Sequence, residues 1–207
     1  MLLSKKLWES NTKLAYLSLN TRFVQGLKTG KLPRNIFKEY LAQDYFFLES
    51  FAKAYRLAVS KSKDKNVIKS LSQLLVGVSD ELILHESYAK EWDIDLSTNY
   101  IKPATKNYTD FLNDVSKKLS TFEIMFAMTP CMRLYSWIGK SLSGRVLNNP
   151  YKRWIITYSD KSFDNLAKSL EEIIDNHQEQ YDVNNAKILY QKAMELELDF
   201  FDAYSNF

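Results

Sequence analysis

The chain contains few residues that end a helix. Only 5 glycines and 4 prolines occur among its 207 residues, and these two residue types are the strongest local breaks in regular structure. Apolar residues recur about every 3.6 positions along most of the chain, whereas sustained alternation of apolar and polar residues is missing. We therefore predict an all-α helical bundle that forms a single domain over residues 1–207.

Turn signals and capping residues give the expected helix boundaries. A first long helix is predicted from about Lys5 to Leu27, ending at Gly30. Ser120 and Glu123 form the pattern of a capping box that begins another helix, and Asn184 is the expected cap of the last one. The other helices are expected over residues 33–61, 64–92, 103–119, 120–143, 151–158 and 161–180. Segments 93–103 and 145–150 are predicted to be a loop and a break.

Composition narrows the possible partners and the compartment. Hydrophobic residues make up 45% and charged residues 26% of the chain, which is typical of globular rather than disordered proteins. The net charge is +3, with no block of lysines or arginines, so we expect no nucleic-acid or membrane partner. The first ten residues are too short and polar for a secretory signal, and no apolar run approaches a membrane span. With one unpaired cysteine, the cytoplasm is the expected location.

Cys131 is the only cysteine and directly follows Pro130. It cannot form an internal disulfide, so it serves either packing, as a small buried hydrophobe, or chemistry. Proline lacks an N–H group and clashes with the preceding turn, so Pro130 is expected to kink or restart its helix. A restart would place Cys131 in a first helical turn, where free amide groups favour a thiolate.

Two carboxylates occupy positions that the helical pattern assigns to the interior. Asp44 shares one helix face with Tyr40, Phe47, Leu48, Phe51 and Tyr55, and Glu197 shares one with Phe200, Phe201 and Tyr204. An unpaired buried charge is very costly, so each carboxylate needs a partner. That partner is either another helix, through an ion pair or a cap, or a ligand.

Several phenols and one polar pair complete the candidate residues. Cys131 and Tyr135 share a further face, and Tyr108 and Tyr158 are either site residues or core residues with surface hydroxyls.

Glu81 and His85 have a spacing that supplies metal ligands in helical bundles. The chain has only 2 histidines, and His177 is expected at an exposed helix end. A di-iron site of that kind therefore cannot be assembled, and we predict no metal. Glu81 and His85 are interpreted as a structural or interface polar pair.

Six strings together resemble the TenA family, also called thiaminase II or aminopyrimidine aminohydrolase. They span nearly the whole chain in the family's order and are FVQGLKTGKLPRNIFKEYLAQDYFFLESFAKAY, DELILHE, KPATKNYTDFL, TPCMRLYSWIG, YKRWIITYSDKSF and ELELDFFDAY. The resemblance implies an all-α, haem-oxygenase-like fold and a homotetramer. It also implies that no metal or organic cofactor is needed.

The resemblance also implies roles for individual residues. Cys131 matches the nucleophile of the cysteine-containing branch, and Glu197 matches the acid/base carboxylate. Asp44 matches the residue that contacts the aminopyrimidine, and Phe47 replaces a tyrosine found in many members. The positions that match the pocket tyrosines are Tyr108, Tyr135 and Tyr158.

The implied substrates are small molecules. One is 4-amino-5-aminomethyl-2-methylpyrimidine, which hydrolysis converts to hydroxymethylpyrimidine for thiamine salvage; the other is thiamine, which is cleaved to hydroxymethylpyrimidine and thiazole. The main alternative is a non-catalytic pyrimidine- or thiamine-binding or regulatory protein of the same fold. A haem-oxygenase-like oxidase is disfavoured by the scarcity of histidine. An interaction protein would need the aromatic helix faces to be exposed.

Overall fold

The protein is built from α-helices. The computed structural model describes the chain except residues 95, 97–99 and 146–147, and only the backbone at 145 and 178. Among the described residues there are ten α-helices and two short 3-10 turns, and no strand. The α-helices are α1 (Leu3–Ser10), α2 (Thr12–Leu19), α3 (Arg22–Thr29), α4 (Arg34–Lys61), α5 (Lys65–Trp92), α6 (Pro103–Lys118), α7 (Thr121–Leu142), α8 (Lys152–Ser159), α9 (Lys161–Asn176) and α10 (Val183–Asp202). The all-α prediction is confirmed.

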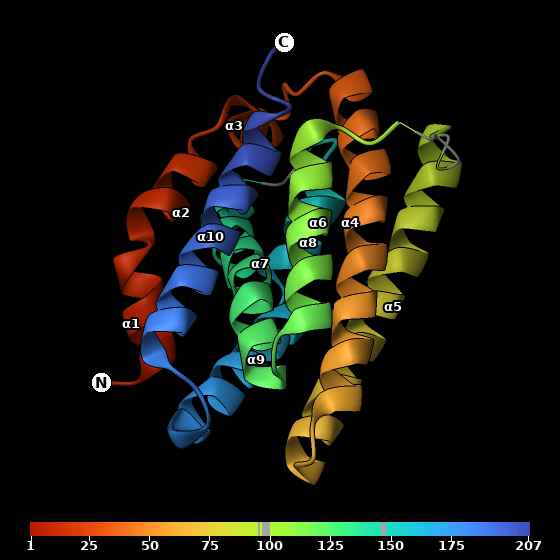
Figure 1. Cartoon of the computed structure of the whole chain (residues 1–207). Helices are drawn as coiled ribbons and strands as arrows, with labels where there is room; N and C mark the ends of the chain where they lie inside the picture. Colours follow the sequence, from red (N-terminus) through yellow and green to blue (C-terminus); the bar gives the residue numbers. More distant parts are fainter. Residues whose placement is uncertain (95, 97–99, 146–147) are drawn as a thin grey trace.

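Helix α7 forms the centre of the bundle. It packs against α4, α6, α8, α9 and α10, and most of its residues are buried; the partly exposed face carries Arg133, Trp137, Lys140 and Ser141. A helix covered in this way needs apolar residues over most of its circumference, as the sequence of α7 provides. In Figure 1, α4, α5, α6, α7 and α10 run side by side, with α1 and α2 lying along α10. Side chains from several long helices therefore converge around the middle of α7.

The long helices begin and end largely where the sequence predicts. The capping box of Ser120 and Glu123 is present at the start of α7. Gly30 ends α3 with a φ of 70°, a left-handed conformation that glycine adopts without steric cost. The N-terminal cap of α10 is Asp182, whose carboxylate accepts a hydrogen bond from the backbone N–H of Asn184 at 2.8 Å. The prediction of Asn184 as the cap is therefore wrong. Helix α9 ends at Asn176, and a separate 3-10 turn covers 178–180. The predicted segments 93–103 and 145–150 lie partly outside the described residues.

The prediction of one helix from Lys5 to Leu27 is wrong, because two asparagines break it. The Asn11 side-chain amide donates to the Leu7 carbonyl at 2.8 Å, and the Asn20 amide donates to the Tyr16 carbonyl at 2.7 Å. The Asn11 side chain satisfies the Leu7 carbonyl while the Asn11 backbone N–H bonds the Trp8 carbonyl instead. The Asn20 side chain adds a second donor to the Tyr16 carbonyl. The chain therefore turns between α1 and α2 and again before α3.

Pro130 does not interrupt its helix. Helix α7 continues through it from Thr121 to Leu142. Proline removes one backbone hydrogen bond, and the burial of most of α7 offsets that loss. Cys131 consequently lies in the middle of a helix, and the expectation that it occupies a first turn is wrong.

No helix in the described part of the chain combines the length and the apolar character needed to cross a membrane.

Gly139 allows α8 to lie directly against α7. A Cβ atom at this position would come within 2.4 Å of the Tyr158 carbonyl carbon and 2.6 Å of the Ser159 nitrogen. Both are backbone atoms, so α8 itself would have to move. We expect Gly139→Ala to lower the free energy of unfolding by roughly 1–3 kcal/mol, the usual cost of overpacking. Thermal unfolding measures this effect. Gly144→Ala is the control, because nothing lies within 4 Å of a Cβ there; equal melting temperatures for the two variants would contradict the expectation.

Candidate functional site

The seven predicted site residues are all buried around the middle of α7. They come from five helices: Asp44 and Phe47 from α4, Tyr108 from α6, Cys131 and Tyr135 from α7, Tyr158 from α8 and Glu197 from α10. Cys131 is the most exposed of them, at 7%. A small cavity is lined by five of the seven, namely Asp44, Phe47, Cys131, Tyr135 and Tyr158. The structure thus gathers residues that lie up to 153 positions apart in the sequence, from Asp44 to Glu197.

Glu197 links the thiol of Cys131 to the Tyr108 hydroxyl. Tyr108 donates to Glu197 Oε1 at 2.8 Å, and the Cys131 thiol lies close enough to the same carboxyl group for each group to shift the pKa of the other. Burial raises the pKa of Glu197 to about 8. Burial also raises the pKa of the Cys131 thiol well above its usual range, and the neighbouring Glu197 raises it further. At neutral pH the raised pKa values favour the protonated forms of both groups, so Cys131 is a thiol before the reaction begins.

Asp44 has a partner on a neighbouring helix. His85 Nε2 on α5 lies 2.8 Å from Asp44 Oδ2, and the Tyr40 hydroxyl donates to the same oxygen at 3.3 Å. The other ring nitrogen of His85, Nδ1, lies 3.0 Å from the Glu81 carbonyl, which fixes the ring. Burial lowers the pKa of His85, but the hydrogen bond and charge of Asp44 outweigh it, so the pKa is raised overall. The ion-pair alternative for Asp44 is thus present, while Asp44 also lines the cavity.

Glu81 is a second carboxyl group that lines the cavity. It accepts a hydrogen bond from the Tyr158 hydroxyl and lines the cavity together with Asp44. Burial raises the pKa of Glu81 to about 7, although His85 acts in the opposite direction. The interpretation of Glu81 and His85 as a pair is wrong for their side chains, because Glu81 contacts Tyr158 and His85 contacts Asp44. Both residues belong to the site, and only their occurrence in the string DELILHE pointed there.

Aromatic rings fill the remaining walls. The ring centroids of Tyr135 and Tyr158 lie 4.8 Å apart, and those of Phe47 and Tyr108 lie 4.7 Å apart. The Tyr135 hydroxyl lies 3.3 Å from that of Tyr40. The alternative that Tyr108 and Tyr158 are core residues with surface hydroxyls is wrong, since both tyrosines are buried and both hydroxyls donate to carboxyl groups of the site. The aromatic helix faces are likewise buried, which removes the docking surface that an interaction protein would need.

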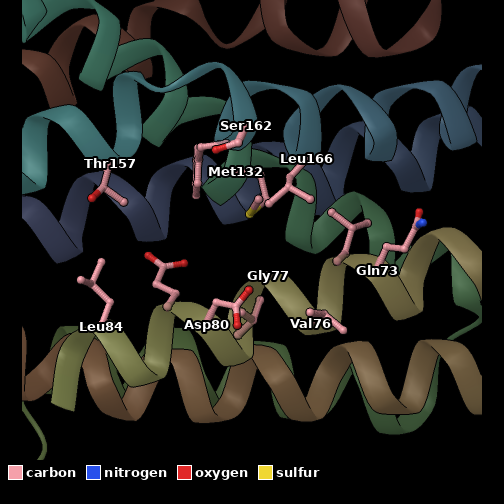
Figure 2. Close-up of a pocket in the computed structure, with 13 residues that line it drawn as sticks. Gln73, Val76, Gly77, Asp80, Leu84, Met132, Thr157, Ser162 and Leu166 are labelled. Atoms are coloured by element: carbon pink, nitrogen blue, oxygen red, sulfur yellow. The ribbon is translucent and has the colours of Figure 1, made fainter. Parts of the chain in front are cut away.

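The cavity is narrow in this structure. Its volume is about 10 Å³, which is room for about one water molecule. A larger groove of about 400 Å³ opens beside it, between α5 on one side and α8 and α9 on the other (Figure 2). Glu81, Met132 and Phe163 line both spaces. Among the described residues, no group of three or more His, Cys, Asp or Glu side chains is arranged to hold a metal ion.

Protonated buried carboxyl groups make stability depend on pH. The pKa of Glu197 is raised from 4.5 to about 8 in the folded protein, so between these values the unfolded chain releases a proton that the folded protein retains. Stability is therefore greatest below pH 4.5 for this group and is lost as the pH rises towards 8. Glu81 and His85, whose pKa values are also raised, act in the same direction.

We expect the melting temperature to fall between about pH 5 and pH 8, with Glu197 alone contributing on the order of 3–5 kcal/mol. Differential scanning fluorimetry across this range measures the change. Glu197→Gln removes the titrating group and is expected to flatten the curve. A melting temperature that rises with pH over this interval would contradict the assignment of raised pKa values.

Comparison with known proteins identifies relatives over most of the chain. The model of the TENA/THI-4/PQQC family matches residues 15–206. A bifunctional TH2 protein, mitochondrial, from Arabidopsis thaliana is 34% identical over 226 residues, which cover 96% of this chain but only 36% of the plant protein. An aminopyrimidine aminohydrolase from Halalkalibacterium halodurans is 30% identical over 182 residues, covering 84% of this chain and 81% of that protein.

Solved structures share the fold. A TenA homologue from P. horikoshii OT3 superposes with a TM-score of 0.91 at 23% identity, covering 99% of this chain and 98% of the other. Heme oxygenase from Leptospira interrogans superposes with a TM-score of 0.60 at 15% identity, covering 98% of this chain and 100% of the other. These likenesses confirm the predicted haem-oxygenase-like, TenA-like fold.

Proposed function

Because this chain belongs to the TENA/THI-4/PQQC family, we propose that it is an aminopyrimidine aminohydrolase of the thiaminase II type. Its substrate is 4-amino-5-aminomethyl-2-methylpyrimidine, which it converts to hydroxymethylpyrimidine for thiamine salvage, and thiamine is a second substrate. The observation that carries this proposal is the buried pair of neighbouring groups Cys131 and Glu197 beside an aromatic cavity. The naming of a relative from Halalkalibacterium halodurans as aminopyrimidine aminohydrolase supports it.

The aromatic walls suit the pyrimidine ring. A flat heterocycle gains stacking contacts between Phe47 and the rings of Tyr135 and Tyr158. Asp44 accepts hydrogen bonds from the exocyclic amine or shares a proton with a ring nitrogen. His85 and Tyr40 hold Oδ2 of Asp44, so this carboxylate is oriented before the substrate arrives. Phe47 offers ring surface without a hydroxyl group.

The proposed reaction begins with a proton transfer inside the Cys131–Glu197 pair. Ionised Glu197 takes the thiol proton, and the thiolate adds to the pyrimidine ring, forming a carbon–sulfur bond. With the aminomethylpyrimidine, Glu197 then returns this proton to the leaving amine as the bond at the 5-methylene breaks; with thiamine, the quaternary nitrogen leaves as neutral thiazole and Glu197 releases the proton to water. Water adds to the methylene carbon while Glu197 takes its proton, and the thiolate is expelled from the ring. A carboxyl group with a pKa near neutrality serves both steps.

Product analysis tests the proposal. The purified protein is incubated separately with the aminomethylpyrimidine and with thiamine, and hydroxymethylpyrimidine is measured by chromatography. Release of hydroxymethylpyrimidine from the amine is the expected result. Binding of either compound without any product would contradict the proposal and leave the alternative of a pyrimidine-binding or regulatory protein.

We further propose that the protein acts in the cytoplasm as a homotetramer. A single cysteine is compatible with a reducing compartment. Exposed apolar side chains on the neighbouring helices α2 and α10, namely Tyr16, Leu17 and Ile188, offer surface for contacts between copies. Light scattering measures the mass of the assembly, and a monomer would contradict the tetramer.

A further inference from the structure

The groove beside the cavity is large enough to hold part of a ligand. Its volume of about 400 Å³ lies within the usual range of ligand pockets. Figure 2 shows Leu84, Gly77 and Val76 along the α5 wall and Thr157, Ser162 and Leu166 on the opposite wall, with Met132 between them. None of these residues belongs to the seven predicted from the sequence.

The groove begins where the narrow cavity ends. Glu81, Met132 and Phe163 line both spaces, so these three side chains form the boundary between them. A pyrimidine ring held against Cys131 and Asp44 needs space for the substituent on its 5-methylene. The cavity itself has no such space, and the groove provides open volume on the side of the shared boundary.

The charges along the groove have one sign. Its charged lining residues are the carboxylates Asp80 and Glu81, and no lysine or arginine is among the described residues that line it. Asp80 is exposed, whereas Glu81 lies at the boundary and holds the Tyr158 hydroxyl. The exposed Asp80 carboxylate, joined by Glu81 when that group is ionised, attracts a cation that approaches along this wall. The rest of the lining is largely apolar, which suits a ring or an alkyl group.

We propose that this groove is the leaving-group subsite, which receives the substituent on the 5-methylene of the pyrimidine and favours one that carries positive charge. The proposal rests on the proposed function, because it assigns a place to the second half of that function's substrates. Glu81 lies at the boundary with the cavity and Asp80 lies further out along α5. A leaving ammonia group needs little of the groove, whereas a thiazolium ring extends into it.

Blocking the groove tests the proposal. Thr157→Trp narrows it from α8, and Leu84→Trp narrows it from α5. The measured quantity is the ratio of kcat/KM for the aminomethylpyrimidine to kcat/KM for thiamine. We expect both variants to raise this ratio by at least about tenfold, the scale on which pocket size discriminates substrates.

Ile156→Trp is the matched control, because Ile156 precedes Thr157 on α8, is 52% exposed and does not line the groove. Its ratio is expected to equal that of the parent protein.

Charge is tested separately. We expect Asp80→Asn to raise KM for thiamine about two- to fivefold at low salt and to have no effect at high salt, where exposed charges are screened. Glu86→Gln is the control, an exposed carboxylate on α5 that does not line the groove.

The outcomes separate the two proposals. No product from either substrate with the parent protein means that the proposed function is wrong. Activity on the aminomethylpyrimidine with no activity on thiamine, or equal losses on both substrates in Thr157→Trp and Leu84→Trp, overturns the leaving-group subsite while the proposed function stands. Circular dichroism of both variants shows whether an equal loss reflects unfolding; a folded variant whose ratio is unchanged also overturns the subsite.

Discussion

Cys131→Ala is expected to lower kcat for hydroxymethylpyrimidine release by on the order of a thousandfold or more, because the carbon–sulfur bond of the proposed intermediate can no longer form. Binding of the pyrimidine should persist, since Asp44 and the aromatic walls are unchanged. Alanine lacks only the sulfur atom, so it leaves a small void at this buried position. The free energy of unfolding is therefore expected to fall by about 1 kcal/mol. Single-turnover kinetics and equilibrium binding measure the two effects separately.

Cys131→Ser is a useful companion to this variant. The hydroxyl group keeps a hydrogen bond to Glu197 but is a far weaker nucleophile than a thiol. Both variants should therefore be inactive while they bind the pyrimidine. Hydrolysis at the parent rate by either one would mean that the reaction proceeds by direct attack of water, without a covalent intermediate.

Glu197→Gln is expected to reduce kcat by about 10²–10⁴-fold, the usual contribution of a positioned acid or base. Glutamine keeps an acceptor for the Tyr108 hydroxyl, so the geometry of the pocket is preserved while proton transfer is lost. Asp199→Asn is the matched control, an exposed carboxylate two positions further along α10. Equal rates for the two variants would rule out an acid/base role for Glu197.

The dependence of kcat/KM on pH also tests the acid/base role of Glu197. Ionised Glu197 is the form that accepts the thiol proton, so kcat/KM of the parent protein is expected to rise with pH up to about 8. Below that pH the carboxyl group is protonated and cannot act as the base. Glu81, with its pKa raised to about 7, titrates nearby. The rise near pH 8 should therefore be absent from Glu197→Gln but retained in Glu81→Gln.

The pattern of apolar residues predicts most helices well and fails in the N-terminal segment, where three short helices stand in place of one long helix. Helices α4, α5 and α6 begin and end within a residue or two of the predicted positions, because burial and capping act together there. Asn11 and Asn20 break the first segment through side-chain hydrogen bonds that compete only weakly with a helix, so composition does not reveal them. At Pro130 the rule that proline interrupts a helix does not hold, since burial of most of α7 outweighs one lost backbone hydrogen bond.

Some residues of the candidate site could be predicted from the sequence and others could not. Asp44 and Glu197 stand out in the sequence because a carboxylate on an aromatic face conflicts with burial. Glu81 and His85 are four residues apart, and their spacing suggests a mutual interaction. Their side chains instead contact Tyr158 and Asp44 on other helices, and sequence spacing carries no information about those contacts. The groove depends on the placement of α5 against α9, which the sequence pattern does not predict.

The narrowness of the cavity has a consequence for the speed of ligand capture. A space of about 10 Å³ does not admit a pyrimidine ring, so side chains at its boundary, such as Met132 and Phe163, must move before the ligand reaches Cys131. Association then waits for an opening fluctuation, and its rate constant falls below the values typical of open sites. Release of product waits for the same fluctuation. In such a protein, packing around two apolar side chains sets the residence time of whatever the pocket encloses.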